Sequence, residues 1–152
     1  MATVIYPTDK VKKIENIFLA GTIDMGNSIN WQQQVIDALK DEDVIIYNPR
    51  RKDWDNSWKE NINDPQFNHQ VNWELDCLEK CDLVLMYFAP NSKSPISLLE
   101  TGLFKDKLLV CCPEGFYKKG NIDIVCERYN IPQINDLDQC LNYIKEQLKV
   151  TL

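Results

Sequence analysis

Short apolar runs alternate with helical patterns along most of the chain, and this alternation constrains the fold more than any other feature. Apolar runs bounded by turn residues predict strands at 14–22, 42–49, 82–90, 107–113 and near 131–134. The segments between them predict helices at 29–40, at 68–80, from Ser94 onward, at 122–128 and at 137–149. Strands that are apolar throughout indicate a parallel sheet covered on both faces. We therefore expect an α/β protein with a doubly wound, five-stranded parallel sheet, flavodoxin-like or Rossmann-like.

The length and charge of the chain limit its domain count and its partners. With no repeat and no Gly/Ser-rich linker, residues 1–152 are expected to form one domain. The net charge of −6 argues against a nucleic-acid polymer, because binding to its backbone requires a basic surface. No apolar run is long enough for a membrane span, and "MATVIYPTDKVKK" lacks the apolar core of a signal peptide. We expect a small-molecule partner and no membrane partner.

Cysteine and histidine usage bears on the compartment and on metals. The six cysteines contain no CxxC pair, so we interpret them as buried thiols of a protein in the reducing cytoplasm. A single histidine excludes a multi-histidine metal site or a zinc finger. We expect neither a metal nor a cofactor.

Ligands of doubly wound sheets bind beyond the carboxyl ends of the strands, which here are residues 21–24, 48–54, 89–97 and 113–121. The connection at 48–68 is unusually long and rich in Trp, Arg and Asp, and we interpret it as a binding loop. The chain contains no GxGxxG fingerprint, no P-loop and no GxSxG elbow. Carboxylates remain as the candidate catalytic groups.

Glu100 occupies an unexpected place on the helix that Ser94 and Pro95 begin. On a helical wheel the apolar residues of this helix share one side, which we expect to face the core, and Glu100 lies on that side. These apolar residues are Ile96, Leu99 and Leu103, with Phe104 at the edge.

Glu74 lies in a similar place on the preceding helix, at the flank of its inward stripe of Val71, Leu75 and Leu78. A buried carboxylate is costly unless it is paired, neutralised or functional. One interpretation is that each glutamate sits at the rim, paired with an arginine or lysine. The other is that Glu74 and Glu100 form a catalytic pair.

Paired carboxylates suit the cleavage of glycosidic bonds. One attacks or stabilises the anomeric carbon, and the other manages the proton of the leaving group. The attacking carboxylate has to be ionised, and Ser94, Ser97 and the first-turn N–H groups of the same helix would supply hydrogen bonds to it.

Four stretches resemble the nucleoside 2-deoxyribosyltransferase family, over about residues 16–132. They are "IFLAGTID", "NPRRKDWD", "VNWELDCLEKCDLVLMYF" and "SPISLLETGLF". The last is similar to the family signature in which a glutamate followed by x-Gly is the nucleophile, which implies that role for Glu100. The resemblance places Glu74 where the family has an acid near the sugar and base. It also implicates Asn121, within "YKKGNIDI", near the sugar, and implies a homo-oligomer.

The chain differs from the best-known members of this family at two positions. They carry aspartate at the Glu74 position and a second aspartate where this chain has Ser94. The motifs resemble more closely the broader deoxyribosyltransferase-like branch with "NPRR" and "SPISLLE".

Several residues are expected to hold a nucleoside or nucleotide. Gly21 and Thr22 would allow close approach, and Asp24 and Asn48 would contact the base edge. Trp54 would provide a stacking wall.

The two arginines bear on whether the substrate is phosphorylated. Arg50, Arg51 and the serines at the helix start would hold a 5′-phosphate. Alternatively, one arginine pairs with Asp53 or Asp55 inside the loop.

Three functions therefore stay open. The first is transfer of the sugar of a (2′-deoxy)nucleoside or nucleotide to another base through a covalent glycosyl-Glu100 intermediate. The second is hydrolysis of a nucleoside 5′-monophosphate at the N-glycosidic bond. The third is nucleotide sensing without catalysis.

Overall fold

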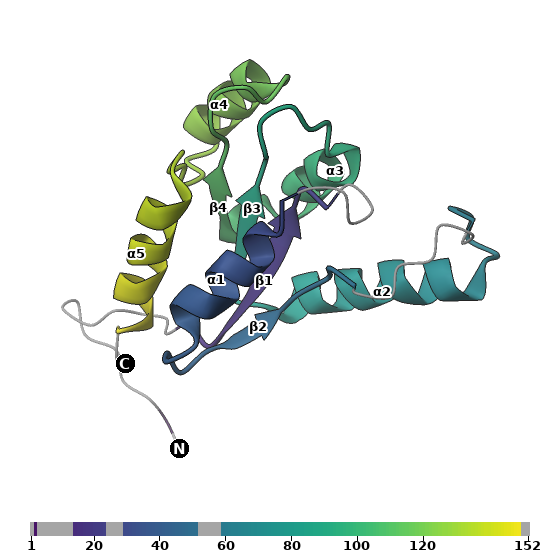
Figure 1. Ribbon diagram of the computed structural model, residues 1–152, viewed down its shortest axis with the longest axis horizontal. Coiled ribbons are helices and arrows are strands. Elements are labelled where there is room, and N and C mark those ends of the chain that lie inside the picture. Colours follow the sequence, from purple (N-terminus) through teal and green to yellow (C-terminus); the bar gives the residue numbers. More distant parts are fainter. Residues whose placement is uncertain (1, 3–13, 24–28, 52–58, 150–152) are drawn as a thin grey trace.

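The structure is a computed structural model that describes residue 2 and residues 14–23, 29–51 and 59–149. Asp24, Asp53 and Trp54, for which the sequence predicts binding roles, lie outside the described residues. Strands and helices alternate as expected from β1 to α4, and a second helix, α5, follows α4 directly (Figure 1). The elements are β1 (Asn16–Gly21), α1 (Trp31–Leu39), β2 (Ile45–Tyr47), α2 (Pro65–Lys80), β3 (Leu83–Tyr87), α3 (Pro95–Leu103), β4 (Leu108–Cys111), α4 (Lys119–Arg128) and α5 (Leu137–Leu148).

The four strands form one parallel sheet in the order β2-β1-β3-β4. β1 pairs with β3 along its length, from Ile17 opposite Leu83 to Gly21 opposite Tyr87. The strand order reverses between β1 and β3, so their carboxyl ends mark the expected ligand edge.

The prediction of five strands is wrong, because the sheet has four. The segment expected as the fifth forms only a single parallel bridge, between Val110 and Gln133. Two hydrogen bonds support it, from Val110 N to Pro132 O and from Ile134 N to Val110 O, both 2.9 Å. Because Pro132 has no N–H to donate, the pairing stops at this bridge.

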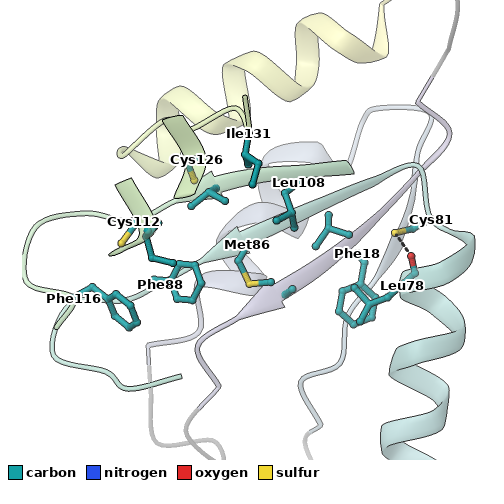
Figure 2. Packing of buried hydrophobic residues seen from close by; sticks show 14 of the residues in the cluster. Phe18, Leu78, Cys81, Met86, Phe88, Leu108, Cys112, Phe116, Cys126 and Ile131 are labelled. Carbon is teal, nitrogen blue, oxygen red and sulfur yellow. Dashed lines mark hydrogen bonds between the residues drawn. The ribbon is translucent and has the colours of Figure 1, made fainter. Parts of the chain in front are cut away.

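Alternate strand residues bury into two separate cores, one on each face of the sheet. Ile17 and Leu19 pack with α1 and α5, whereas Phe18 and Ala20 pack with α2 and α4. Figure 2 shows the second core, in which Phe18, Met86 and Phe88 lie among residues of α2, the β4 region and α4. Helices therefore cover both faces, as the doubly wound prediction requires.

All six cysteines are free and buried in these two cores, which confirms that they are packing thiols. No helix in the described ranges is both long and apolar enough to cross a membrane.

Candidate functional site

A cluster of three buried hydroxyl groups marks the carboxyl ends of β1 and β3. Thr22 Oγ1 lies 2.7 Å from Ser94 Oγ and 3.0 Å from Ser92 Oγ, and the two serine oxygens are 3.1 Å apart. The Ala89 N–H donates to Thr22 Oγ1 at 2.9 Å. Thr22 is therefore the centre of this hydroxyl cluster, which joins the turn after β1 to the segment that leads into α3.

Gly21 is required by the packing of the chain itself at this point. Its φ of +126° is in the region that favours glycine, and a Cβ there would lie 2.1 Å from Tyr87 O. The β3 backbone therefore fills the space that a side chain at this position would need. Thr22, one residue later, donates its N–H to the same Tyr87 O at 2.9 Å.

Ser94 is the N-cap residue of α3 and Pro95 is its first helical residue, as predicted. Its hydroxyl does not cap the helix, however, because it bonds to Thr22 instead. Ser94 takes a left-handed conformation with φ of +47°. The first-turn N–H groups of α3 therefore have no side-chain cap. They lie beside the hydroxyl cluster, and an anion would be favoured at this helix start.

The orientation of α3 is the reverse of the one that its apolar stripe predicts. Ile96, Leu99 and Leu103 are 62%, 61% and 59% exposed, so the expectation that they face the core is wrong. Ser97, Glu100 and Thr101 are buried instead. Because α3 packs over the hydroxyl-rich end of the sheet, its small polar side chains face inward and its aliphatic ones face outward.

Glu100 is buried, at 9% exposure, even though its helix shows its apolar side to solvent. Within the described residues, no ion pair and no hydrogen bond reaches its carboxylate. Ser94 and Ser97 do not supply the hydrogen bonds expected for an ionised acid. Burial first, and repulsion from Glu74 second, raise the pKa of Glu100 from 4.5 to about 8.

Glu74 lies close enough to Glu100 for its negative charge to raise the pKa of Glu100. Burial raises the pKa of Glu74, and a hydrogen bond from Gln70 Nε2 to Glu74 Oε1, 3.2 Å long, opposes that rise. Two consecutive crossover helices, α2 and α3, therefore bring two acids together in surroundings that favour their neutral forms. No group of three or more His, Cys, Asp or Glu within the described residues is arranged for a metal ion.

Two buried glutamines connect this site to the paired arginines, and sequence reasoning missed both. Gln70 Nε2 also donates to Pro49 O at 3.3 Å, and Gln70 Oε1 accepts from Arg51 Nη1 at 3.4 Å. On α1, Gln32 Nε2 donates to Thr22 O and Gln32 Oε1 accepts from Arg50 Nη1, both at 3.4 Å.

Each arginine is thus linked through one glutamine to one half of the site. Arg51 is linked through Gln70 to Glu74, and Arg50 through Gln32 to Thr22. The spacing of Gln70 four residues before Glu74 was the available signal for the first link. For Gln32 the signal was its place next to Trp31, whose indole N–H donates to Thr22 O at 2.8 Å.

Asn48 and Asn121 are the remaining predicted residues, and neither makes a hydrogen bond to the two acids among the described residues. Asn48 Oδ1 accepts from the Arg50 N–H at 3.1 Å, so this side chain shapes the turn that presents the arginines. Asn121 is exposed on α4 and makes no hydrogen bond to the hydroxyl cluster or the two acids among the described residues.

Comparison with protein families matches residues 14–116 to the model described as "Nucleoside 2-deoxyribosyltransferase like". The chain belongs to this family. The matched range includes the hydroxyl cluster, both arginines, Glu74 and Glu100, and it ends before Asn121.

A solved structure supports the fold of this family member. The crystal structure of a conserved protein from Enterococcus faecalis V583 is similar, with a TM-score of 0.61 and 14% sequence identity. The similarity covers 89% of this chain and 99% of that chain, and at this identity it shows the fold alone. No curated protein matches the chain significantly.

Proposed function

We propose that this member of the family cleaves the N-glycosidic bond of a (2′-deoxy)nucleoside or its 5′-monophosphate and transfers the sugar to another base. The observation that carries the proposal is the pairing of two acids, the half-buried Glu74 and the buried Glu100, near the ligand edge of the sheet. Chemistry at an anomeric carbon calls for such a pair.

In the proposed reaction Glu100 is the nucleophile. A carboxylate oxygen of Glu100 forms a bond to C1′ as the bond from C1′ to the base nitrogen breaks. The electron pair of that bond leaves with the base, which takes a proton from Glu74 or from a group that Glu74 orients. A nitrogen of a second base then attacks C1′ as the bond from C1′ to Glu100 breaks, and the proton of that nitrogen returns to Glu74 or to the group that Glu74 orients.

The raised pKa of Glu100 adds a requirement to this reaction. With a pKa of about 8, Glu100 carries a proton in most molecules at neutral pH, so it has to lose that proton before it attacks. The second acid has to hold a proton for the leaving base. Because repulsion between Glu74 and Glu100 opposes double ionisation, the pair is suited to hold one proton between them.

Hydrolysis of a nucleoside 5′-monophosphate is the second candidate, and the surroundings of the acids favour it. The hydroxyl cluster lies at the uncapped start of α3, and Gln32 links it to Arg50. Hydroxyl groups, first-turn N–H groups and a guanidinium are the donors that a phosphate takes. In this reaction water, instead of a second base, releases the sugar from Glu100.

Incubation of deoxynucleosides and their 5′-monophosphates with and without an acceptor base tests both functions. Exchange that requires the acceptor supports the transferase, whereas release of free base without an acceptor supports the hydrolase. Glu100→Gln keeps the shape and burial of the side chain, and we expect it to lower the rate by at least about a thousandfold.

The matched control is Glu79→Gln, on the exposed side of α2, which should leave turnover unchanged. Tight nucleotide binding by the unaltered protein without any turnover would contradict both enzymatic functions and leave nucleotide sensing.

A further inference from the structure

A groove away from the two acids lies between α4 and the segment that follows this helix. Its volume is about 440 Å³. Lys119, Asp123 and Glu127 line it from α4, where their four-residue spacing places them in one row. Because pockets that hold small molecules begin at about 300 Å³, the groove is large enough for a ligand.

A chain of hydrogen bonds fixes the two amide side chains that line the groove after α4. Gln133 Nε2 donates to Asp123 Oδ1 at 2.7 Å and to Asn135 Oδ1 at 3.1 Å. Asn135 Oδ1 also accepts from the Cys112 N–H at 3.1 Å, directly after the end of β4. Since the Asp123 carboxylate only accepts and the Cys112 N–H only donates, the orientation of both amides follows from their partners.

The two ends of this chain remain available to a ligand. Within the described residues, Gln133 Oε1 accepts no hydrogen bond and Asn135 Nδ2 donates none. The groove therefore offers one acceptor and one double donor whose positions are fixed before a ligand binds. A molecule that has both donors and acceptors uses both ends.

The charges along α4 disfavour an anionic ligand. Lys119 Nζ pairs with Asp123 at 2.9 Å, and the hydrogen bonds from Lys119 and Gln133 hold the pKa of Asp123 below its usual value. Asp123 is thus ionised and its charge is balanced. Glu127 has no ion pair among the described residues and adds one negative charge to the groove, which would repel a phosphate or a carboxylate.

The two buried residues that line the groove provide an apolar surface. Cys126 and Ile131 are 3% and 6% exposed and belong to the core that Figure 2 shows. An apolar surface beside fixed polar groups suits a flat ring whose polar atoms lie at its rim. An uncharged nucleobase has this shape and carries both donors and acceptors.

We propose that the groove beside α4 is a second ligand site, which binds an uncharged nucleobase through Gln133 Oε1 and Asn135 Nδ2. The ring of the base packs against Cys126 and Ile131, and the Glu127 carboxylate accepts from an amino or ring N–H group. No residue that lines this site belongs to α2 or α3, the helices that carry the two acids. The site does not depend on the proposed chemistry, although that reaction would supply such bases.

Titration of the full chain with adenine and with cytosine, followed by proton–nitrogen NMR, tests the proposal. We expect the side-chain amide signals of Gln133 and Asn135 to shift and to saturate with at least one of the two bases. Glu100→Gln should bind the base in this groove with unchanged affinity. Failure of the proposed chemistry would therefore leave this binding intact, and the two ideas are tested separately.

Asn135→Asp separates a ligand site from a network that only braces the chain. It keeps an oxygen that accepts from Gln133 and from the Cys112 N–H but replaces the available donor, so it should weaken base binding by at least about tenfold. The matched control is Asn142→Asp, the same change at an exposed position of α5, which should bind like the unaltered chain. Absence of shifts at Gln133 and Asn135 up to the solubility limit of both bases would overturn the proposal, as would equal affinity of the two variants.

Discussion

Glu100 is a buried acid to which the described residues offer no partner that would offset its burial. Such a group is costly to the folded protein whenever it is ionised. Acids with such perturbed pKa values are typical of functional sites, where the neighbouring polar groups bind a ligand and do not pair with the acid. The same property gives a stability test that needs no substrate.

The free energy of unfolding should depend on pH through Glu100. Since the folded protein holds this proton up to about pH 8 and the unfolded chain releases it near 4.5, stability falls as pH rises between these values. Glu100→Gln removes this loss. We expect it to raise the free energy of unfolding by a few kcal/mol at pH 9 relative to the unaltered chain, and by much less at pH 5. Urea unfolding at the two pH values measures the difference, and an equal effect at both would contradict the assignment.

Gln70 is expected to hold Glu74 in position and to keep its pKa from rising further. In Gln70→Leu the loss of this hydrogen bond should move the titration of the Glu74 carboxyl to higher pH, as followed by carbon NMR. The variant should also lose about 1–3 kcal/mol of stability, because Pro49 O loses a donor.

Gln66→Leu, on the exposed first turn of the same helix, is the control for this experiment. It should leave the Glu74 titration in place. If the two variants titrate alike, Gln70 does not position Glu74.

At the scale of elements, the site depends on how closely β1 and β3 approach at their carboxyl ends. Gly21→Ala would place a methyl group against Tyr87 O in a backbone conformation that alanine avoids. We expect a loss of several kcal/mol of stability, together with loss of activity, since Thr22 follows directly. Thermal unfolding measures the loss. Gly102→Ala, with open space around it, is the control and should not destabilise the fold.

The helix α3 also shows where sequence periodicity stops being informative. An apolar stripe on a helix predicts the face that packs against the core. Here the strand ends beneath α3 carry hydroxyl groups instead of an apolar surface, so the polar face of the helix packs inward. The sequence therefore predicted the helix and the burial of Glu100 but reversed the side that Ile96 and Leu99 occupy. Gln32 and Gln70 were missed because a glutamine in a helix is typical of exposed positions.

For the whole molecule, the doubly wound fold could be predicted because the strands buried on both faces are continuous apolar runs. The fifth strand could not be excluded from sequence, because a short run such as 131–134 is typical of a strand whether or not a neighbour pairs with it. The resemblance in "SPISLLETGLF" and "NPRRKDWD" predicted the family, which the match over residues 14–116 confirms.

The central claim is that Glu100 bonds covalently to the sugar of the substrate. Mass spectrometry of the protein, quenched in acid during turnover of deoxynucleosides or their 5′-monophosphates and then digested, tests it most directly. We predict an added deoxyribosyl group on the peptide that contains Glu100, and its loss in Glu100→Gln. Release of base by a Glu100→Gln protein at the rate of the unaltered chain, with no adduct in either, would contradict the claim.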